Sequence, residues 1–465
     1  MKILIVNKFL YPNGGSETYI FQIGQQLMSM GHEVQYFGME HEGRIVGNRV
    51  NAYTADVNFH KKSLAQLTYP IKILYSTEAR KKIRLVLDDM QPDVVHLNNI
   101  NFQITPSIID EIRLYERQTG RKVRVIATAH DYQWVCPNHM LRIEETGELC
   151  ARCIDGDCRQ CAKHRCIHGS RLRSVLGTME AQLYRKRHTY RQVDRIICPS
   201  SFMQQMLAHN PDLSGRLVTM HNYIADGMLQ PTKTGKAVST SSGEACGKEL
   251  AEKQKSPYVL YFGRFCPEKG TDTLLKAAEM LPEIHFVFAG TGEEGYTDRI
   301  NKLLNCEMVG FLTGDALKEK ISGAAFSVIP SEWYENCPFT VIESQLYGTP
   351  VIASDIGGIP ELLNALDMHN DKQNSTEKKR TPQDGEEDAM TERELDPGPI
   401  ETGDATGILF TPGDADELAD RIRFLWNHPV ILQKLRANCR ENTRGRFLTL
   451  SGYTEKLIDI YTDRK

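Results

Sequence analysis

The sequence predicts an α/β protein made of two doubly wound domains, each with a parallel sheet between layers of helices. Short, β-branched apolar runs alternate with stretches of helical spacing in both halves of the chain. A polar tract rich in Ser, Gly and Lys separates the two halves. A chain of 465 residues is also too long for one ordinary domain, so each half is large enough to bury its own core.

The first half begins with a strand and continues in βα order. The apolar run that starts at Lys2 is followed by a Gly-containing turn and by helical spacing from Ser16. This helix is expected to end at Gly31, because glycine is the usual residue after a helix C-terminus. Further strands are expected in the runs HEVQYFGM, PDVVHLNNI, KVRVIATAHD, DRIICPS and GRLVTMHNYI.

A second βα series fills the other half. Its expected strands are YVLYFGRF, HFVFAGTG, CEMVGFL, AFSVIPS, PVIASD and GILFTP. The segments DADELADRIRFLWN and SGYTEKLIDIYTDRK are expected to close the chain as helices. The expected divisions are a first domain at 1–228 with a Cys-rich insert at 136–168, a linker at 229–257, a second domain at 258–445 with a disordered insert at 368–404, and a C-terminal helix at 446–465.

Composition and charge argue against a nucleic-acid-binding, membrane-spanning or secreted protein. The formal net charge of −4 gives no bulk attraction to nucleic acid. No apolar run approaches the roughly 20 residues of a membrane-spanning helix. The apolar run at the N-terminus is short and is followed at once by charge and proline, as in a first strand and unlike a signal peptide. We therefore expect a cytoplasmic protein, whose 12 cysteines are mostly reduced thiols or metal ligands.

The stretch PSEWYENCPFTVIESQLYG carries the strongest sign of a ligand site. It leaves a buried strand, forms a short loop and enters a helix, whose first N–H groups suit a diphosphate. Pro338 has no N–H, so the expected phosphate donors are Phe339 and Thr340. Glu335 stands at the edge of the loop, and Glu343 lies in the first turns of the helix. Because ligands of doubly wound sheets bind at the carboxyl ends of strands, the site is expected in the cleft between the domains.

Four motifs together carry a family resemblance: YPNGGSETY, AHDYQWVCP, YFGRFCPEKG and the stretch just described, in this order. With them the chain resembles the retaining, nucleotide-sugar-dependent glycosyltransferases of GT-B fold, family 4, over nearly its whole length. The resemblance implies two Rossmann-like domains that face each other across a cleft, the first binding the acceptor and the second the donor. It implies transfer of a sugar, of the hexosyltransferase type, to a hydroxyl of a glycan or lipid-linked acceptor in cell-surface polysaccharide or glycolipid synthesis.

The resemblance also assigns two expected catalytic residues. The family histidine that contacts the transferred sugar matches His130, which ends a predicted strand and so points toward the cleft. The acid near the sugar matches Glu335. This chain departs from many relatives in the loop itself, where Asn336, Cys337 and Pro338 replace small, Gly-rich residues.

The expected donor-binding residues come from three segments. Arg264 and Lys269 lie five residues apart on one loop and match the family pair that grips the diphosphate. Such cations stabilise the leaving group without a metal, so no cofactor is expected for catalysis. Glu343 matches the glutamate that accepts hydrogen bonds from the ribose. Gly14 and Gly15 are expected to face the diphosphate across the cleft, because glycine allows close approach of the backbone.

A block of cysteines has the spacing of a metal site. Cys150, Cys153, Cys158 and Cys161 form two C-x2-C pairs, which favour a structural Zn²⁺. The gap between the pairs is shorter than in ordinary zinc ribbons. An iron–sulfur cluster and a set of unliganded thiols therefore remain open as alternatives.

Basic residues follow this block with few acids among them: Arg159, Lys163, Arg165, Arg171, Arg173, Arg185, Lys186, Arg187, Arg191 and Arg195. Such a segment fits either an anionic membrane surface, at the inner face of the membrane, or a solvated face. No recognition helix or stacking motif accompanies the charge, so no nucleic-acid partner is expected. The alternatives to a glycosyltransferase are a sugar-nucleotide epimerase or phosphorylase of the same fold, and a zinc-stabilised nucleic-acid-binding protein.

Overall fold

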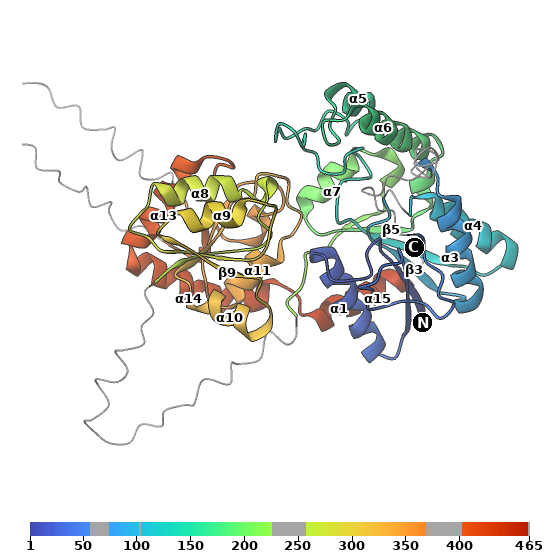
Figure 1. The fold of residues 1–465 in the computed structure, drawn as a ribbon. Coiled ribbons are helices and arrows are strands. Elements are labelled where there is room, and N and C mark those ends of the chain that lie inside the picture. The colour runs from blue at the N-terminus through green and yellow to red at the C-terminus, as the bar shows by residue number, and fades with distance from the viewer. Residues whose placement is uncertain (56–73, 102–103, 226–256, 369–401, 464–465) are drawn as a thin grey trace, which may run out of the picture.

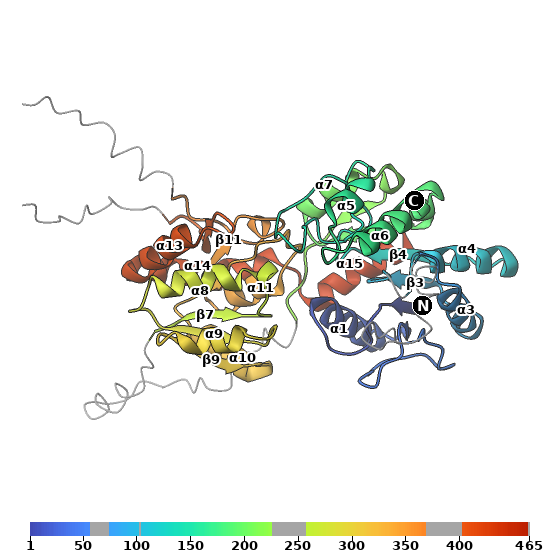
Figure 2. The ribbon, with the colours of Figure 1, turned by 45° about the horizontal axis from the view of Figure 1, so that its top comes forward.

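The computed structural model describes residues 1–55, 74–101, 104–225, 257–368 and 402–463. Two six-stranded parallel sheets stand next to each other, each with helices around it (Figures 1 and 2). The doubly wound α/β fold predicted from the alternating runs is thereby confirmed. The predicted linker at 229–257 and the predicted disordered insert at 368–404 lie almost wholly outside the described residues.

The first sheet has the strand order β2-β1-β3-β4-β5-β6. Its strands are β1 Lys2–Val6, β2 Glu33–Phe37, β3 Val94–Leu97, β4 Arg124–Thr128, β5 Arg195–Cys198 and β6 Leu217–Thr219. The helices of this part are α1 Gly15–Ser29, α3 Thr77–Met90, α4 Ser107–Thr119, α5 Arg159–His164, α6 Arg171–Lys186 and α7 Ser201–Ala208, with 3-10 turns η2 Thr189–Gln192 and η3 Pro211–Leu213. Helix α1 ends as predicted, with Gly31 in the left-handed region just after its C-terminus.

The second sheet has the order β12-β11-β10-β7-β8-β9. Its strands are β7 Val259–Phe262, β8 Phe286–Ala289, β9 Cys306–Gly310, β10 Phe326–Ile329, β11 Val351–Ser354 and β12 Gly407–Phe410. Around them lie η5 Pro267–Lys269, α8 Thr271–Glu279, α9 Tyr296–Lys302, α10 Gly314–Gly323, α11 Phe339–Leu346, η6 Pro360–Leu362, α13 Ala415–Asn427 and α14 Pro429–Arg446.

Strand order determines where each sheet opens a crevice. In the first sheet, successive strands are added on one side of β1 and then, from β3 onward, on its other side. In the second sheet the same change occurs between β7 and β10. The loops that leave these strands at their carboxyl ends splay to opposite faces, which makes a binding crevice at each switch point. The motifs singled out in the sequence follow β1, β4, β7 and β10, so they lie at these two crevices or beside them.

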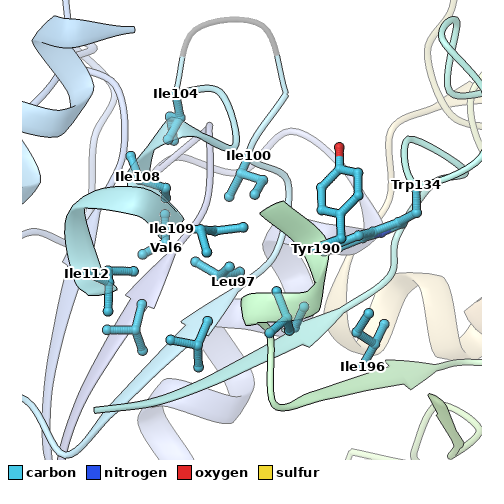
Figure 3. Close-up of a cluster of buried hydrophobic side chains, with 14 of the residues drawn as sticks. Val6, Leu97, Ile100, Ile104, Ile108, Ile109, Ile112, Trp134, Tyr190 and Ile196 are labelled. Atoms are coloured by element: carbon cyan, nitrogen blue, oxygen red, sulfur yellow. The ribbon is translucent and has the colours of Figure 1, made fainter. Parts of the chain in front are cut away.

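Buried aliphatic side chains hold the first sheet to its helices. Ile108, Ile109 and Ile112 of α4 pack against Val6 and Leu97 of the central strands (Figure 3). The aromatic pair Trp134 and Tyr190 extends this cluster beyond β4, with ring centroids 4.7 Å apart. The strands of this crevice therefore rest on a rigid, dry base.

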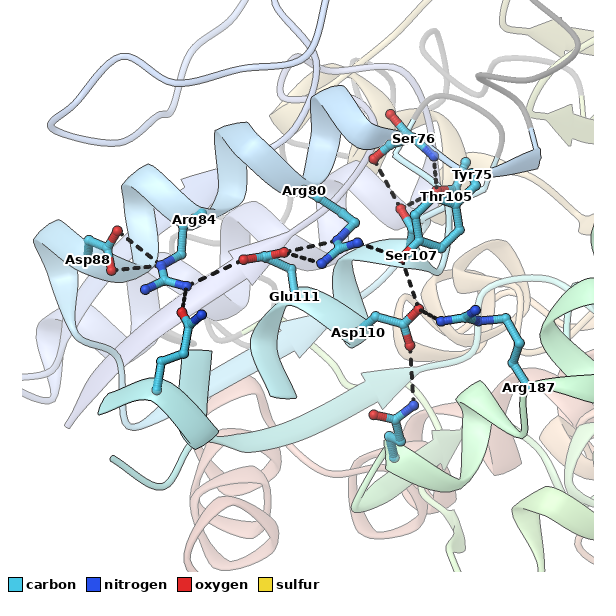
Figure 4. A network of polar contacts seen from close by, with 12 residues as sticks. Tyr75, Ser76, Arg80, Arg84, Asp88, Thr105, Ser107, Asp110, Glu111 and Arg187 are labelled. Carbon is cyan, nitrogen blue, oxygen red and sulfur yellow. Dashed lines mark hydrogen bonds and ion pairs between the residues drawn. The ribbon is translucent and has the colours of Figure 1, made fainter. Parts of the chain in front are cut away.

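A polar network joins the outer helices of the same part (Figure 4). Two guanidinium nitrogens of Arg80 of α3 donate to Oε2 of Glu111 of α4, over 2.6 and 2.9 Å. Arg187, which follows α6, pairs with Asp110 of α4 at 2.8 Å. The C-terminal end of α6 is thus tied to the α3–α4 pair.

The last helix, α15 Leu450–Thr462, returns to the first sheet and lies beside α1 (Figure 1). The hydroxyls of Tyr453 and Tyr19 are 3.0 Å apart, and the Tyr461 hydroxyl is 2.7 Å from Nδ1 of His96. The chain therefore braces its first part with its last helix. In the described ranges, no helix is long and apolar enough to cross a membrane.

Candidate functional site

An ion pair marks the switch point of the second sheet. Nζ of Lys269, after β7, donates to Oε1 of Glu335, after β10, over 2.6 Å. Ser331 Oγ donates to the same oxygen over 2.7 Å. Burial acts to raise the pKa of Glu335, but the Lys269 ammonium and the Ser331 hydroxyl outweigh it, so this pKa lies below its usual range. Glu335 is therefore an ionised carboxylate although only 5% of it is exposed.

Glycines allow the loop around Glu335 to pack closely. A side chain at Gly270, whose φ is +67°, would meet the Pro330 carbonyl oxygen at 1.7 Å. Across the loop, Gly358 donates its N–H to the Glu335 carbonyl over 2.7 Å. A Cβ at Gly358 would lie 1.9 Å from the Asn336 carbonyl oxygen. The two segments that flank the loop thus approach its backbone more closely than any other residue would permit.

The same loop carries an unsatisfied polar atom. Within the described chain, Oδ1 of Asn336 is buried and has no hydrogen-bond partner, whereas the buried indole N–H of Trp333 acts on the Glu335 carboxylate. The Lys269 ammonium lies 5.2 Å from the centroid of the Trp333 ring. Unpaired buried polar groups cost free energy, and they concentrate where a ligand completes the bonding.

His130 follows β4 and lies in the crevice of the first sheet. Its Nε2 is 2.9 Å from Oδ1 of Asn98. The Asn98 amide group is oriented by its own Nδ2, which donates to the carbonyls of Val6 and His96. A flipped amide would point its oxygen at two other oxygens, so Oδ1 must face His130 and Nε2 must carry the proton.

The remaining nitrogen of His130 is consequently an acceptor. Burial lowers the pKa of His130 to about 4, which keeps the ring neutral near neutral pH. Among the described residues, Nδ1 makes no hydrogen bond. His130 thus offers a lone pair, and this suits a hydroxyl of a ligand.

Contacts across the cleft bring the two predicted catalytic residues into one site. Asn336, next to Glu335, donates from Nδ2 to the His130 carbonyl over 2.6 Å. Tyr132, two residues beyond His130, donates its hydroxyl to the Tyr334 carbonyl over 3.2 Å. The loop after β10 therefore contacts the loop after β4 directly.

The sides of two helices, α1 and α11, line a small pocket beside this contact. Thr18 and Gln22 of α1 line it from one side, and Phe339 and Glu343 of α11 from the other. Both helices start at a residue without a side-chain cap, so their first N–H groups are available to an anion. Burial raises the pKa of Glu343 to about 7, and hydrogen bonds from a ligand would restore its charge.

Of the predicted donor-binding positions, Phe339 and Glu343 line this pocket. Gly14 and Gly15 form the exposed start of α1, and Phe339 and Thr340 open α11. The predicted roles of Arg264 and Lys269 at the diphosphate stay predictions. Arg264 pairs with Glu268 at 2.5 Å, and its side chain is 63% exposed.

The first crevice is also lined by a polar network that was not predicted from the sequence. Lys8 Nζ donates to Oδ1 of Asn101 over 3.2 Å, and Asn101 Nδ2 donates to Asp131 over 2.9 Å. Burial lowers the pKa of Lys8, while Asp131 and Glu17 act against that shift. These groups border the acceptor side of the cleft predicted from the motifs.

Asn98, Ser331 and Asn336 are the site residues that the sequence did not reveal. Their contacts with His130 and Glu335 depend on side-chain amides and hydroxyls, which occur throughout the surface of any protein. The one usable signal was position, since Asn98 directly follows a predicted strand at the switch point.

The predicted metal ligands do not all lie together. Cys150, Cys153 and Cys161 share a small buried cluster with Cys166, and Cys158 is outside it. In the parts of the chain that the structure describes, no three His, Cys, Asp or Glu side chains are placed to hold a metal ion. Zinc at the four predicted cysteines therefore stays a prediction, and Cys166 is a further candidate ligand.

Comparison with known proteins gives a consistent result. A family model described as Glycosyltransferase Family 4 matches residues 13–225, and one described as Glycosyl transferases group 1 matches residues 245–377. An uncharacterised 42.6 kDa protein in the cps region of Klebsiella pneumoniae is 23% identical over 79% of this chain and 88% of its own. Alpha-D-kanosaminyltransferase from Streptomyces kanamyceticus is 22% identical over 60% of this chain and 62% of its own.

Solved structures share the arrangement of both sheets. Sucrose-phosphate synthase from Thermosynechococcus elongatus superposes with a TM-score of 0.63 at 17% identity, over 99% of this chain and 98% of its own. HepE from Anabaena, in complex with UDP and glucose, gives 0.60 at 15% identity, over 99% of each chain. WaaG, a glycosyltransferase involved in lipopolysaccharide biosynthesis, gives 0.58 at 14% identity, over 99% of each chain. At these identities the likeness shows the fold.

Proposed function

Since the chain belongs to the group 1 glycosyltransferases of GT-B fold, we propose that it transfers a hexosyl group from a nucleoside diphosphate sugar to an acceptor hydroxyl with retention of anomeric configuration. The observation that carries the proposal is the Lys269–Glu335 pair, placed at a switch point and in contact with the loop of His130. The similarity to a protein of a cps region and the shared fold with WaaG support a role in the synthesis of a cell-surface glycan.

The leaving diphosphate would lie between Lys269 and the starts of α1 and α11. The ammonium and the two helix dipoles would then stabilise the negative charge that grows as the glycosidic bond breaks. Glu343 would accept hydrogen bonds from the ribose hydroxyls in the same pocket. The complex of HepE with UDP and glucose supports a donor of this class.

The transferred sugar would lie between Glu335 and His130. Both are hydrogen-bond acceptors, since Glu335 is ionised and Nδ1 of His130 carries a lone pair. Two acceptors on either side of a sugar fix its orientation through its hydroxyls.

The acceptor would enter from the side of the first sheet. Lys8, Asn101 and Asp131 present a linked set of donors and acceptors there, which suits the hydroxyls of a glycan. This assignment explains why the two crevices face each other, because the sugar has to pass from one bound partner to the other.

Turnover with product analysis tests the proposal. The purified chain is incubated with UDP-, GDP- and ADP-sugars and a mixture of glycan acceptors, and release of nucleoside diphosphate and formation of a glycoside are measured. We expect one donor to be consumed, and the new linkage to keep the donor's anomeric configuration by NMR. An epimerised donor without a glycoside product would refute transfer and favour an epimerase. Phosphate-dependent release of a sugar phosphate would refute transfer and favour a phosphorylase. An inverted product would refute retention.

A further inference from the structure

Helix α6 buries its polar side and exposes its apolar side. Its buried residues are Ser174, Gly177, Thr178, Glu180 and Tyr184. Leu172 and Met179 are 69% and 48% exposed. Surface helices ordinarily show the reverse pattern, as α4 does with its buried isoleucines.

The outward apolar residues form one stripe. Leu172, Leu176, Met179 and Leu183 recur at intervals of three or four, so they share a single face of the helix. Leu176 and Leu183 are half-buried, and the stripe runs for most of the length of α6. Among the described residues, Leu172 and Met179 at this face stay exposed.

The exposed charges of α6 itself are all positive. Arg171, Arg173 and Lys186 of α6 are exposed, and none of them has an ion-pair partner among the residues that the structure describes. The acid of this helix, Glu180, is buried on the opposite side. Lys163 and Arg165, in and just after the neighbouring α5, add two further exposed bases.

The helix is held in place before any partner arrives. Thr178 donates its hydroxyl to the Cys158 carbonyl over 3.0 Å, and Tyr184 donates to the Leu74 carbonyl over 2.9 Å. A Cβ at Gly177 would lie 2.6 Å from the Ile167 side chain, so α6 packs closely on the chain that precedes it. The apolar stripe is therefore presented by a preformed helix, and binding does not have to pay for its folding.

We propose that the outer face of α6 docks this protein on an anionic lipid bilayer. Apolar side chains flanked by Lys and Arg are the features of a helix that lies in the plane of such a surface. The bases would meet lipid phosphates while Leu172 and Met179 enter the acyl boundary. The opposite side of α6 lines a small pocket with Gln133 and His139, close to the acceptor crevice.

Docking in this way suits the proposed function, on which the choice of a lipid surface over another partner rests. A lipid-linked acceptor would emerge from the bilayer beside α6 and reach the crevice of the first sheet. A second copy of the chain is the other occupant that the experiment has to distinguish.

Vesicle flotation with the full chain tests the proposal. The probes are vesicles of phosphatidylcholine alone and of phosphatidylcholine mixed with phosphatidylglycerol. The chain is expected to float with the anionic vesicles only. The double variant Leu172→Ser/Met179→Ser should bind at least about tenfold more weakly, because it removes the apolar contact. Arg171→Gln/Arg173→Gln should lose about fivefold per base removed.

Leu304→Ser/Phe311→Ser is the matched control. These two side chains are 106% and 73% exposed, but they belong to the part of the chain with the second sheet. The control should bind vesicles as the wild type does, and all variants should keep the wild-type melting temperature and turnover of a water-soluble acceptor.

Three results would overturn the proposal. The wild type fails to bind anionic vesicles, the Leu172→Ser/Met179→Ser variant binds as tightly as wild type, or this variant converts a dimer to a monomer while vesicle binding is unaffected. Binding with the expected pattern but without sugar transfer would uphold the docking face and refute the proposed function instead.

Discussion

The Lys269 ammonium donates to Glu335, so a diphosphate bound under the proposed function would compete with that carboxylate. The side chain of Lys269 is 29% exposed, which leaves it within reach of a ligand. The two residues would then work as a unit, in which Lys269 exchanges its partner when the donor binds. Glu335 would then be released to hydroxyls of the sugar.

The variant Glu335→Gln separates the proposed role of Glu335 at the sugar from its competition with the diphosphate for Lys269. The amide still accepts from Ser331, so we expect the fold to persist, but turnover should fall by about 100-fold because the carboxylate next to the sugar is lost. Nucleoside diphosphate should bind as tightly as before or more tightly, since a competing negative charge is removed. Steady-state kinetics and calorimetry measure both effects.

Glu332→Gln is the control for that substitution, because Glu332 lies in the same loop but accepts a hydrogen bond from Thr273. It should turn over at close to the wild-type rate. Equal losses in both variants would mean that any disturbance of the loop suffices, and would remove Glu335 from the site.

Asn98 should act through His130. Asn98→Leu removes the acceptor that holds the proton on Nε2, so the ring can present either nitrogen to the sugar. We expect a loss of about 10- to 100-fold in turnover with little change in nucleoside diphosphate affinity. In a His130→Ala background the same substitution should cost little more, because coupled residues are not additive.

Nitrogen-15 shifts of His130 in the resting protein give an independent reading. They should report Nε2–H in the wild type and a mixture of tautomers in Asn98→Leu. A wild-type ring protonated at Nδ1 would contradict the geometry, whatever the activity of the variants.

At the scale of elements, much of the fold was predictable. The strands were found because parallel strands buried on both faces are nearly continuous apolar runs, such as KILIV and VVHL. The end of α1 was predicted because glycine commonly follows a helix C-terminus, where a positive φ is needed, and Gly31 has such a φ. The loop after β10 was identified through a helix start and two acids, both local signals.

Contacts between loops distant in sequence could not be predicted in the same way. Asn336 meets His130 across 206 residues of chain, and Lys269 meets Glu335 across 66. A sequence can suggest that each residue lies near a cleft, but not which pairs touch. Arg264 is an example, since the sequence suggested a diphosphate partner for it but not its ion pair with Glu268.

The cysteine cluster provides a prediction at the same scale. Purified protein should carry about one zinc per chain by elemental analysis, as a site with four ligands requires. Cys166→Ser should lower the zinc content as much as Cys150→Ser does, whereas Cys158→Ser should lower it less, because Cys158 lies outside the cluster. Iron with a visible absorption band would favour a cluster, and metal-free protein with reactive thiols would refute a metal site.

A deletion variant tests the prediction that the polar insert in the second domain is dispensable. Its flanks meet in the structure, where Asn364 Nδ2 donates to the Asp404 carboxylate over 2.6 Å and the Thr406 N–H donates to the Asn364 carbonyl over 2.8 Å. Replacing 369–401 by a short Gly-Ser link should therefore leave melting temperature and turnover close to wild type. A large loss of either would show that the segment packs on the rest of the chain.

At the scale of the whole molecule, the two parts are joined by specific contacts as well as by the chain. Glu361, after β11, accepts hydrogen bonds from the first two N–H groups of α7, Ser201 and Phe202, at 2.7 and 2.6 Å. Asn222 donates to the Cys337 carbonyl over 2.7 Å. The return of α15 to the first sheet adds a second covalent crossing, so the two crevices are held face to face around the site.

The central claim is that a nucleoside diphosphate binds between these crevices through Lys269. Titration calorimetry with UDP, GDP and ADP, on the wild type and on Lys269→Ala and Arg264→Ala, tests it most directly. We expect one nucleotide to bind the wild type, Lys269→Ala to lose at least about tenfold in affinity because a charge-assisted contact is removed, and Arg264→Ala to lose less because its guanidinium is exposed and paired with Glu268. Failure of all three nucleotides to bind the wild type, or wild-type affinity in Lys269→Ala, would contradict the account.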